Sequence, residues 1–361
     1  KSLAAVSGVA SYNNLSIDSA GAGYTLTASA TGLTGATSSP FTISVGAATK
    51  LGFRGQPGNS TGGVAIPAFQ VEVRDAGGNR VTSASTSIQL TRNGGDANAA
   101  LSGTNPVSAV SGLATFSNIS VDSAANGYTL VASGGGLATA TSNSFNITVG
   151  PAAKLGFRVQ QPTNTVAGVN IQPSVVVELE DAGGNRVTTN GTTIVVAIAN
   201  NPAGGTLFGN TSRNTFGGLA TYNNLNIHNA GTGYTLKATS GSLTQATSFG
   251  FDITPATADH LAFSVQPSNT IGGQTITPAV VVDVLDFFGN LVTGATNSVT
   301  IAIGNNGGVP AGTLAGTQVV NAVGGHATFN DLSIDNAGPS YTLTANATSL
   351  TGATSDPFDI L

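Results

Sequence analysis

The chain has 361 residues, of which only 7% are charged, and its formal net charge is −5. Its 11 lysines and arginines form no cluster, which excludes the basic surface that a protein needs to neutralise a nucleic-acid backbone. The absence of cysteine excludes disulfides, thiolate metal ligands and a cysteine nucleophile.

One motif organises the chain as a tandem repeat. It reads Asp-Ser-Ala-Ala-Asn-Gly-Tyr-Thr-Leu at 122–130 and returns three more times, about 105 residues apart, with small variations. Residues 1–49 match only the C-terminal half of a repeat, whereas 50–153, 154–258 and 259–361 are complete repeats. The seams between repeats are short and contain alanine and proline, so they should restrict the angle between neighbours.

The first complete repeat shows the predicted strands in chain order. A short apolar segment at 51–53 is followed by 68–74, where Phe69, Val71 and Val73 alternate with polar residues. Further segments of this kind follow up to 145–149, with glycine, asparagine and aspartate between them and no helical periodicity. The sequence therefore predicts an all-β protein of tandem immunoglobulin-like β-sandwiches arranged as an elongated rod.

The tyrosine of the repeated motif has a predicted structural role. In immunoglobulin-like sandwiches a tyrosine near the start of the penultimate strand donates its hydroxyl to a main-chain group a few residues upstream. We interpret the four repeated tyrosines as such tyrosine corners: Tyr24, Tyr128, Tyr234 and Tyr341.

A second signature, Asp-x-x-Gly-Asn, follows the alternating strand of each complete repeat. Its glycine is kept in all three copies, whereas the preceding glycine becomes Phe288 in the third copy, so only the kept glycine should need a positive φ. The aspartate is predicted to cap amides of the turn. The hairpin-turn residues are Asp75, Gly78, Asn79, Asp181, Gly184, Asn185, Asp286, Gly289 and Asn290.

Together these features resemble the bacterial Ig-like repeats of invasin- and intimin-type surface proteins. The resemblance rests on Asp-x-x-Gly-Asn after an alternating strand, a late Gly-x-Ala-Thr-Phe strand and the tyrosine strand. It covers the whole chain, and it implies a stalk or spacer at the surface of a bacterial or archaeal cell that presents something else.

The sequence offers no catalytic residues and no cofactor site. His228, His260 and His326 occupy unrelated positions in their repeats and lack paired ligand spacing. A Ca²⁺ role for the repeated aspartates is the alternative to turn capping, but His228 replaces the Asp122-type residue in one copy. No run of 18 apolar residues exists, so no membrane span is expected.

The third repeat has apolar residues where the others are polar, on a strand face and at a hairpin tip. These residues are a candidate subunit contact, although packing within the chain is the open alternative. They are Leu285, Phe287, Phe288 and Leu291.

Few surface charges oppose association, so self-association is expected, either head-to-tail or lateral, or binding to other surface proteins. For residues 1–49, either the earlier strands lie outside this sequence or a neighbouring subunit supplies them. The sequence thus favours a non-catalytic structural subunit of an extracellular filament or cell-surface assembly, with the stalk of a large adhesin as the alternative.

Overall fold

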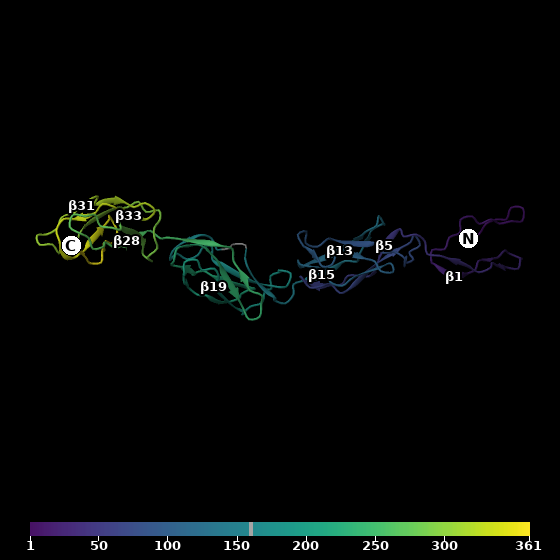
Figure 1. The fold of residues 1–361 in the computed structure, drawn as a ribbon. Coiled ribbons are helices and arrows are strands. Elements are labelled where there is room, and N and C mark those ends of the chain that lie inside the picture. The colour runs from purple at the N-terminus through teal and green to yellow at the C-terminus, as the bar shows by residue number, and fades with distance from the viewer. Residues whose placement is uncertain (159–161) are drawn as a thin grey trace. The chain divides into compact units, whose positions relative to one another are not determined.

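The structure is a computed structural model that describes residues 1–158 and 162–361. None of the described residues lies in a helix, which confirms the predicted all-β fold (Figure 1). The chain divides into two compact units, one formed by Lys1–Lys154 with Leu179–Val187 and the other by Leu155–Glu178 with Thr188–Leu361.

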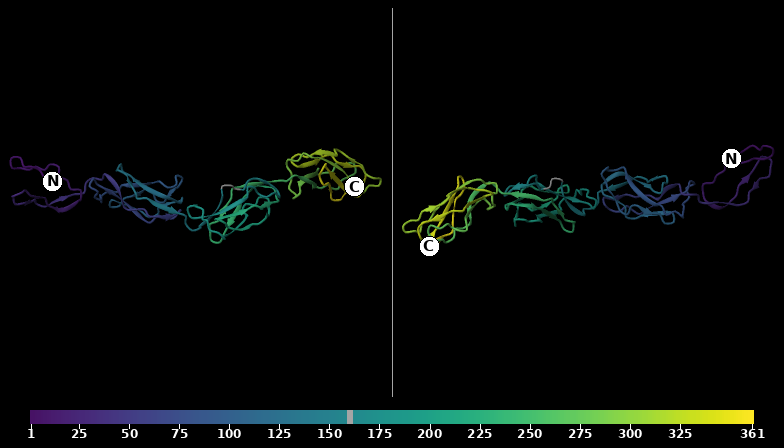
Figure 2. Two further views of the ribbon diagram at one scale, coloured as in Figure 1. Left: turned by 180° about the vertical axis from the view of Figure 1, so that it is seen from behind. Right: turned by 45° about the horizontal axis from the view of Figure 1, so that its top comes forward.

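The first complete repeat is an immunoglobulin-like sandwich of two main sheets (Figures 1 and 2). One sheet has the strand order β11-β7-β5, and the other has the order β10-β8-β13-β15-β6, in which β6 runs parallel to β15. The strands are β5 (Lys50–Gly55), β6 (Ser60–Thr61), β7 (Phe69–Arg74), β8 (Ser87–Asn93), β9 (Leu101–Ser102), β10 (Val107–Ser108), β11 (Leu113–Phe116), β12 (Ser120–Val121), β13 (Ala125–Ser133), β14 (Ala140–Thr141) and β15 (Phe145–Thr148).

The second and third complete repeats follow the same plan. Their first sheets have the orders β16-β18-β22 and β28-β29-β33. The second repeat has β16 (Lys154–Phe157), β17 (Thr165–Val166), β18 (Val175–Glu180), β19 (Thr193–Ile198), β20 (Leu207–Phe208), β21 (Ser212–Asn214), β22 (Leu219–Tyr222), β23 (Asn226–Ile227), β24 (Gly231–Tyr234), β25 (Leu236–Thr239), β26 (Ala246–Thr247) and β27 (Phe251–Thr254). The third has β28 (Ala258–Val265), β29 (Val280–Asp286), β30 (Ser298–Ile303), β31 (Leu314–Ala315), β32 (Val319–Asn321), β33 (His326–Phe329), β34 (Ser333–Ile334), β35 (Gly338–Tyr341), β36 (Leu343–Asn346), β37 (Ala353–Thr354) and β38 (Phe358–Ile360).

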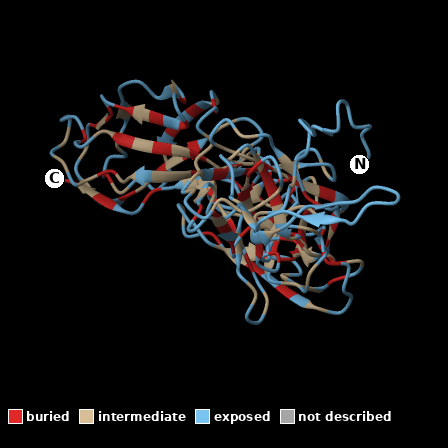
Figure 3. Cartoon of the chain, turned by 90° about the vertical axis from the view of Figure 1, so that its right-hand side faces the viewer, coloured by how far each residue is buried: buried red, intermediate tan, exposed pale blue. Residues whose placement is uncertain are grey.

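The core of a repeat lies between its two sheets, as the period-two pattern predicts. Along β7 the side chains of Phe69, Val71 and Val73 are buried while the intervening residues are partly exposed. Phe69 stacks on Phe116 of β11, with ring centroids 5.5 Å apart. Figure 3 shows this alternation as red bands that interrupt tan and blue along the strands.

The N-terminal half-repeat differs, because none of residues 1–49 is buried. Two short strand pairs form here, and apolar side chains such as Leu3, Val6 and Leu33 lie exposed. The strands are β1 (Gly21–Tyr24), β2 (Thr27–Ala28), β3 (Ala36–Thr37) and β4 (Phe41–Ile43).

Candidate functional site

Each repeated tyrosine closes a short loop of its own repeat. The hydroxyl of Tyr128 donates to the carbonyl oxygen of Ser123 at 2.9 Å, and its ring is fully buried against Phe145 of β15. The corresponding bonds run from Tyr24 to Ser19 at 3.0 Å, from Tyr234 to Asn229 at 2.9 Å and from Tyr341 to Asn336 at 2.9 Å. The tyrosine corner thus fixes a loop five residues upstream, which we call the corner loop: 18–20, 122–124, 228–230 and 335–337.

The aspartate of each Asp-x-x-Gly-Asn turn holds the turn from inside. In the third repeat, Oδ1 of Asp286 accepts hydrogen bonds from the amides of Phe288 and Asn290, both at 2.9 Å. The kept glycine has a positive φ in every copy, with values of 94° at Gly78, 94° at Gly184 and 84° at Gly289. A side chain at this position would strain the backbone, which explains why it is glycine.

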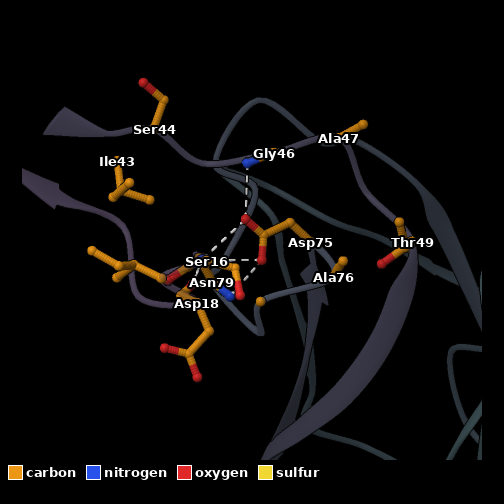
Figure 4. Close-up of a pocket in the computed structure, with 12 residues that line it drawn as sticks. Ser16, Asp18, Ile43, Ser44, Gly46, Ala47, Thr49, Asp75, Ala76 and Asn79 are labelled. Atoms are coloured by element: carbon orange, nitrogen blue, oxygen red, sulfur yellow. Dashed lines mark hydrogen bonds between the residues drawn. The ribbon is translucent and has the colours of Figure 1, made fainter. Parts of the chain in front are cut away.

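The second carboxylate oxygen of the same aspartate reaches the seam before its repeat. Oδ2 of Asp75 accepts a hydrogen bond from the amide of Gly46 at 2.8 Å, which Figure 4 shows as a dashed line. Gly150 donates in the same way to Asp181, and Ala256 to Asp286, each at 2.8 Å. The turn therefore fixes the short connection that leads into its own repeat.

The asparagine of the turn binds the corner loop of the preceding repeat. The Nδ2 of Asn290 donates to the carbonyl oxygen of His228 at 2.7 Å, and its Oδ1 accepts from the amide of Ala230 at 2.7 Å. Asn79 makes the same pair of bonds to Asp18 and Ala20 at 2.7 and 2.9 Å, and Asn185 makes them to Asp122 and Ala124 at 2.7 and 2.7 Å. Sequence reasoning assigned these asparagines only to the turn and missed this contact.

This pairing is that of a β-ladder, with a side chain in place of a strand. In a parallel ladder one residue exchanges hydrogen bonds with the C=O of one neighbour and the N–H of the residue two positions further along. The carboxamide of asparagine carries a donor and an acceptor on one plane, so it satisfies both groups at once. The aspartate orients it, since Nδ2 of Asn290 also donates to Asp286 at 2.9 Å.

The carboxylates of Asp75 and Asp286 are buried and hydrogen-bonded, and their surroundings determine their ionisation. Hydrogen bonds from the side chain of Asn79 and the amide of Gly46 lower the pKa of Asp75 to about 2. Burial alone would raise the pKa of Asp286, but bonds from Asn290 and the Ala256 amide outweigh it, so the pKa is lowered. Both groups are therefore anions at neutral pH.

The first glycine of the turn has a role at the same contact. A Cβ at Gly77 would collide with the carbonyl oxygen of Asp18, and one at Gly183 with that of Asp122. Gly77 and Gly183 are thus needed for close approach to the corner loop. In the third copy Phe288 stands at this position, and the bond from Asn290 to His228 is nevertheless kept.

Phe288 adds an aromatic contact where its turn meets the corner loop of the preceding repeat. We call each such contact between a turn and a corner loop a junction, and this one is the third along the chain. The ring of His228 lies between Phe208 and Phe288, with centroid separations of 4.1 and 4.3 Å. Phe287 meets Phe288 edge-on and is 74% exposed. Of the predicted contact surface, Leu285 and Leu291 pair across their own hairpin and are half-buried, whereas Phe287 and, to a smaller extent, Phe288 are exposed.

The described residues offer little that resembles reactive chemistry. Among residues 1–158 and 162–361 there is no group of three or more histidines and acids arranged to hold a metal ion. Ser264 and His326 both contact Oδ1 of Asp283, at 2.7 Å each, so the serine hydroxyl donates to the carboxylate and has no bond to the imidazole. Nor does the described part of the chain hold a helix long and apolar enough to cross a membrane.

Comparisons with known proteins bear on the fold. No protein-family model matches the sequence, and no curated protein matches it. Among solved structures the chain is similar to FdeC, an Escherichia coli adhesin, with 16% identity over 88% of this chain and 99% of that chain and a TM-score of 0.28. It is similar to invasin, a bacterial integrin-binding protein, with 13% identity over 85% of this chain and 59% of that chain and a TM-score of 0.28. It also resembles extracellular domains 3–5 of Drosophila OTK, with 14% identity over 87% of this chain and 99% of that chain and a TM-score of 0.25.

A β-glycosidase from Bacteroides vulgatus is similar over 58% of this chain but only 25% of its own length, with 13% identity and a TM-score of 0.27. Because all these scores are low, the assignment of an immunoglobulin-like sandwich rests on the strand order of the chain itself.

Proposed function

We propose that the chain is a non-catalytic spacer at the surface of a bacterial or archaeal cell, where its repeats form part of a stalk that presents a binding region to the exterior. The observation that carries this proposal is the contact between turn and corner loop, which is built in the same way at three successive junctions.

A spacer has to keep its modules at a set separation and angle, and this contact provides the means. Without it, a seam of four or five residues would still allow each repeat to swivel about its neighbour. The aspartate fixes the seam and the asparagine fixes the preceding repeat, so one turn restricts both. The extracellular placement is supported by the resemblance of the motifs to invasin- and intimin-type repeats.

A second candidate, a subunit of an extracellular filament, is favoured by a different observation. Each complete repeat has an exposed apolar side chain at the same hairpin: Val110 is 77% exposed, Phe216 83% and Val323 79%. Their neighbours carry few charges that would oppose association. Self-association through these hairpins would convert single chains into a lateral assembly.

Labelling of intact cells tests the proposal. Antibodies against the repeats should bind intact cells of the native host, and negative-stain images of surface material should show single thin stalks. Labelling only after permeabilisation would refute a surface role.

Images of long fibres of uniform width would instead support the filament. In that case the triple variant Val110→Ser, Phe216→Ser, Val323→Ser should abolish the fibres while leaving the melting temperature within about 2 °C, because the three side chains are already exposed. Fibres that survive the triple variant would remove these hairpins from the assembly.

A further inference from the structure

Two side chains bind the corner loop from opposite sides, and they belong to different repeats. At the third junction, Tyr234 of the second repeat binds the carbonyl oxygen of Asn229, the middle residue of the loop. Asn290 of the third repeat binds the flanking groups, the carbonyl oxygen of His228 and the amide of Ala230. We propose that the tyrosine hydroxyl is a positioning group for the junction: it holds the loop in the one conformation that the next repeat's asparagine can bind.

The planarity of the peptide group is the physical basis of this inference. The carbonyl of residue 229 and the N–H of residue 230 belong to one planar trans peptide group, so they point in opposite directions and turn together. The structure shows this arrangement, because Asn290 contacts residues 228 and 230 and Tyr234 contacts residue 229. Rotation of the 229 carbonyl away from the tyrosine would therefore also turn the Ala230 amide away from the asparagine.

The same coupling is present at the other two junctions. Tyr128 holds Ser123 while Asn185 binds residues 122 and 124, and Tyr24 holds Ser19 while Asn79 binds residues 18 and 20. The distances agree to within a few tenths of an ångström although the loop residues differ. This inference goes beyond the proposed function, because it concerns how one repeat positions the loop that the next repeat binds. It does not depend on where the protein is located.

The chain contains a matched control for the effect of the hydroxyl on its own repeat. Tyr341 is fully buried, like Tyr234, and its hydroxyl also donates to an asparagine carbonyl, that of Asn336, at 2.9 Å. In the described part of the chain no asparagine side chain binds residues 335 and 337. In a protein made of residues 1–361, Tyr341→Phe removes the same hydrogen bond with no following repeat to bind the loop, and the difference between Tyr234→Phe and Tyr341→Phe isolates the positioning effect.

The test measures hydrogen exchange of single amides in the protein made of residues 1–361. In Tyr234→Phe the amide of Ala230 should exchange about tenfold faster, the effect expected from losing one hydrogen bond's net contribution. The amide of Ala124, at the intact junction, should be unchanged in both variants. Asn290→Ala serves as the positive control, since it removes the acceptor of the Ala230 amide directly.

A second readout follows the orientation of the repeats, which a purely local role of the hydroxyl would not affect. The chain has no cysteine, so Lys237→Cys and Thr300→Cys, both at exposed strand positions, accept one spin label each. The distribution of the label-to-label distance should broaden in Tyr234→Phe and stay unchanged in Tyr341→Phe. The proposal is overturned if Ala230 keeps its protection in Tyr234→Phe, or if the two tyrosine variants broaden the distribution equally. The cell-labelling experiment is independent of both outcomes.

Discussion

Replacement of Asn290 tests whether the contact between repeats adds to the free energy of unfolding. Asn290→Ala removes the two hydrogen bonds to the corner loop and the bond to Asp286. Asn290→Asp keeps an acceptor for the Ala230 amide but replaces the donor group by a carboxylate oxygen. That oxygen would face the carbonyl of His228 and the anionic carboxylate of Asp286, which now accepts from Nδ2 at 2.9 Å.

The magnitudes follow from these contacts. One net hydrogen bond contributes roughly 0.5–1.5 kcal/mol, and because the corner-loop atoms are only partly buried, water replaces some of the loss in Asn290→Ala. We therefore expect Asn290→Ala to lower the free energy of unfolding by about 1–2 kcal/mol. Asn290→Asp should cost more, about 2–4 kcal/mol at neutral pH, because two carboxylates at hydrogen-bonding distance repel each other.

The assay is urea unfolding followed by tyrosine fluorescence, since the chain contains no tryptophan. Asn321→Asp is the matched control: Asn321 is an exposed residue of the same repeat, so this variant adds a charge without touching a junction. The Asn290→Asp variant should regain stability below about pH 5, where the carboxylate pair takes up a shared proton. If both Asn290 variants match Asn321→Asp within about 0.5 kcal/mol, the asparagine contact does not stabilise the junction and our reasoning fails.

Three further predictions follow, two on the first complete repeat and one on the repeated aspartates. The lowered pKa of Asp75, about 2 against an ordinary 3.8, means that its contribution to stability is present above about pH 4 and is lost as the pH falls towards 2. The difference in unfolding free energy between wild type and Asp75→Ala should shrink over that interval, and a difference that stays constant with pH would contradict the assignment. Phe69→Ala, which removes a fully buried ring stacked on Phe116, should cost about 3–5 kcal/mol in the same urea assay, and a loss below about 1 kcal/mol would argue against a packed core. If turn capping rather than Ca²⁺ binding explains the repeated aspartates, the melting temperature should be the same with and without a chelator, and a drop would indicate a bound metal ion.

The fold could be predicted from the sequence because the patterns that indicate it lie within short segments. Alternation of Phe69, Val71 and Val73 with polar residues identifies the inner face of a strand without reference to any other segment. The turn was readable for the same reason, since Asp286 caps amides two and four residues away.

The contact between turn and corner loop could not be predicted, because the residues that form it are far apart in the sequence. Asn79 binds Asp18 and Ala20, about 60 residues earlier, and no local pattern connects them. One signal was nevertheless present: the asparagine persists in the third copy, where the neighbouring glycine is replaced by Phe288. Within the turn the asparagine side chain donates only its Nδ2 to the aspartate, whereas its Oδ1 accepts a hydrogen bond from the corner loop of the preceding repeat.

The turn asparagine binds only main-chain atoms of the corner loop, and His228 can stand where Asp18 and Asp122 stand in other copies. Any repeat with the tyrosine can therefore precede any repeat with the asparagine, whatever side chains the loop itself carries. Duplication, deletion or shuffling of whole repeats leaves a working joint each time, without compensating mutations. Such a gene can change the length of its product in a single recombination event, and the two halves of the joint are inherited with every copy.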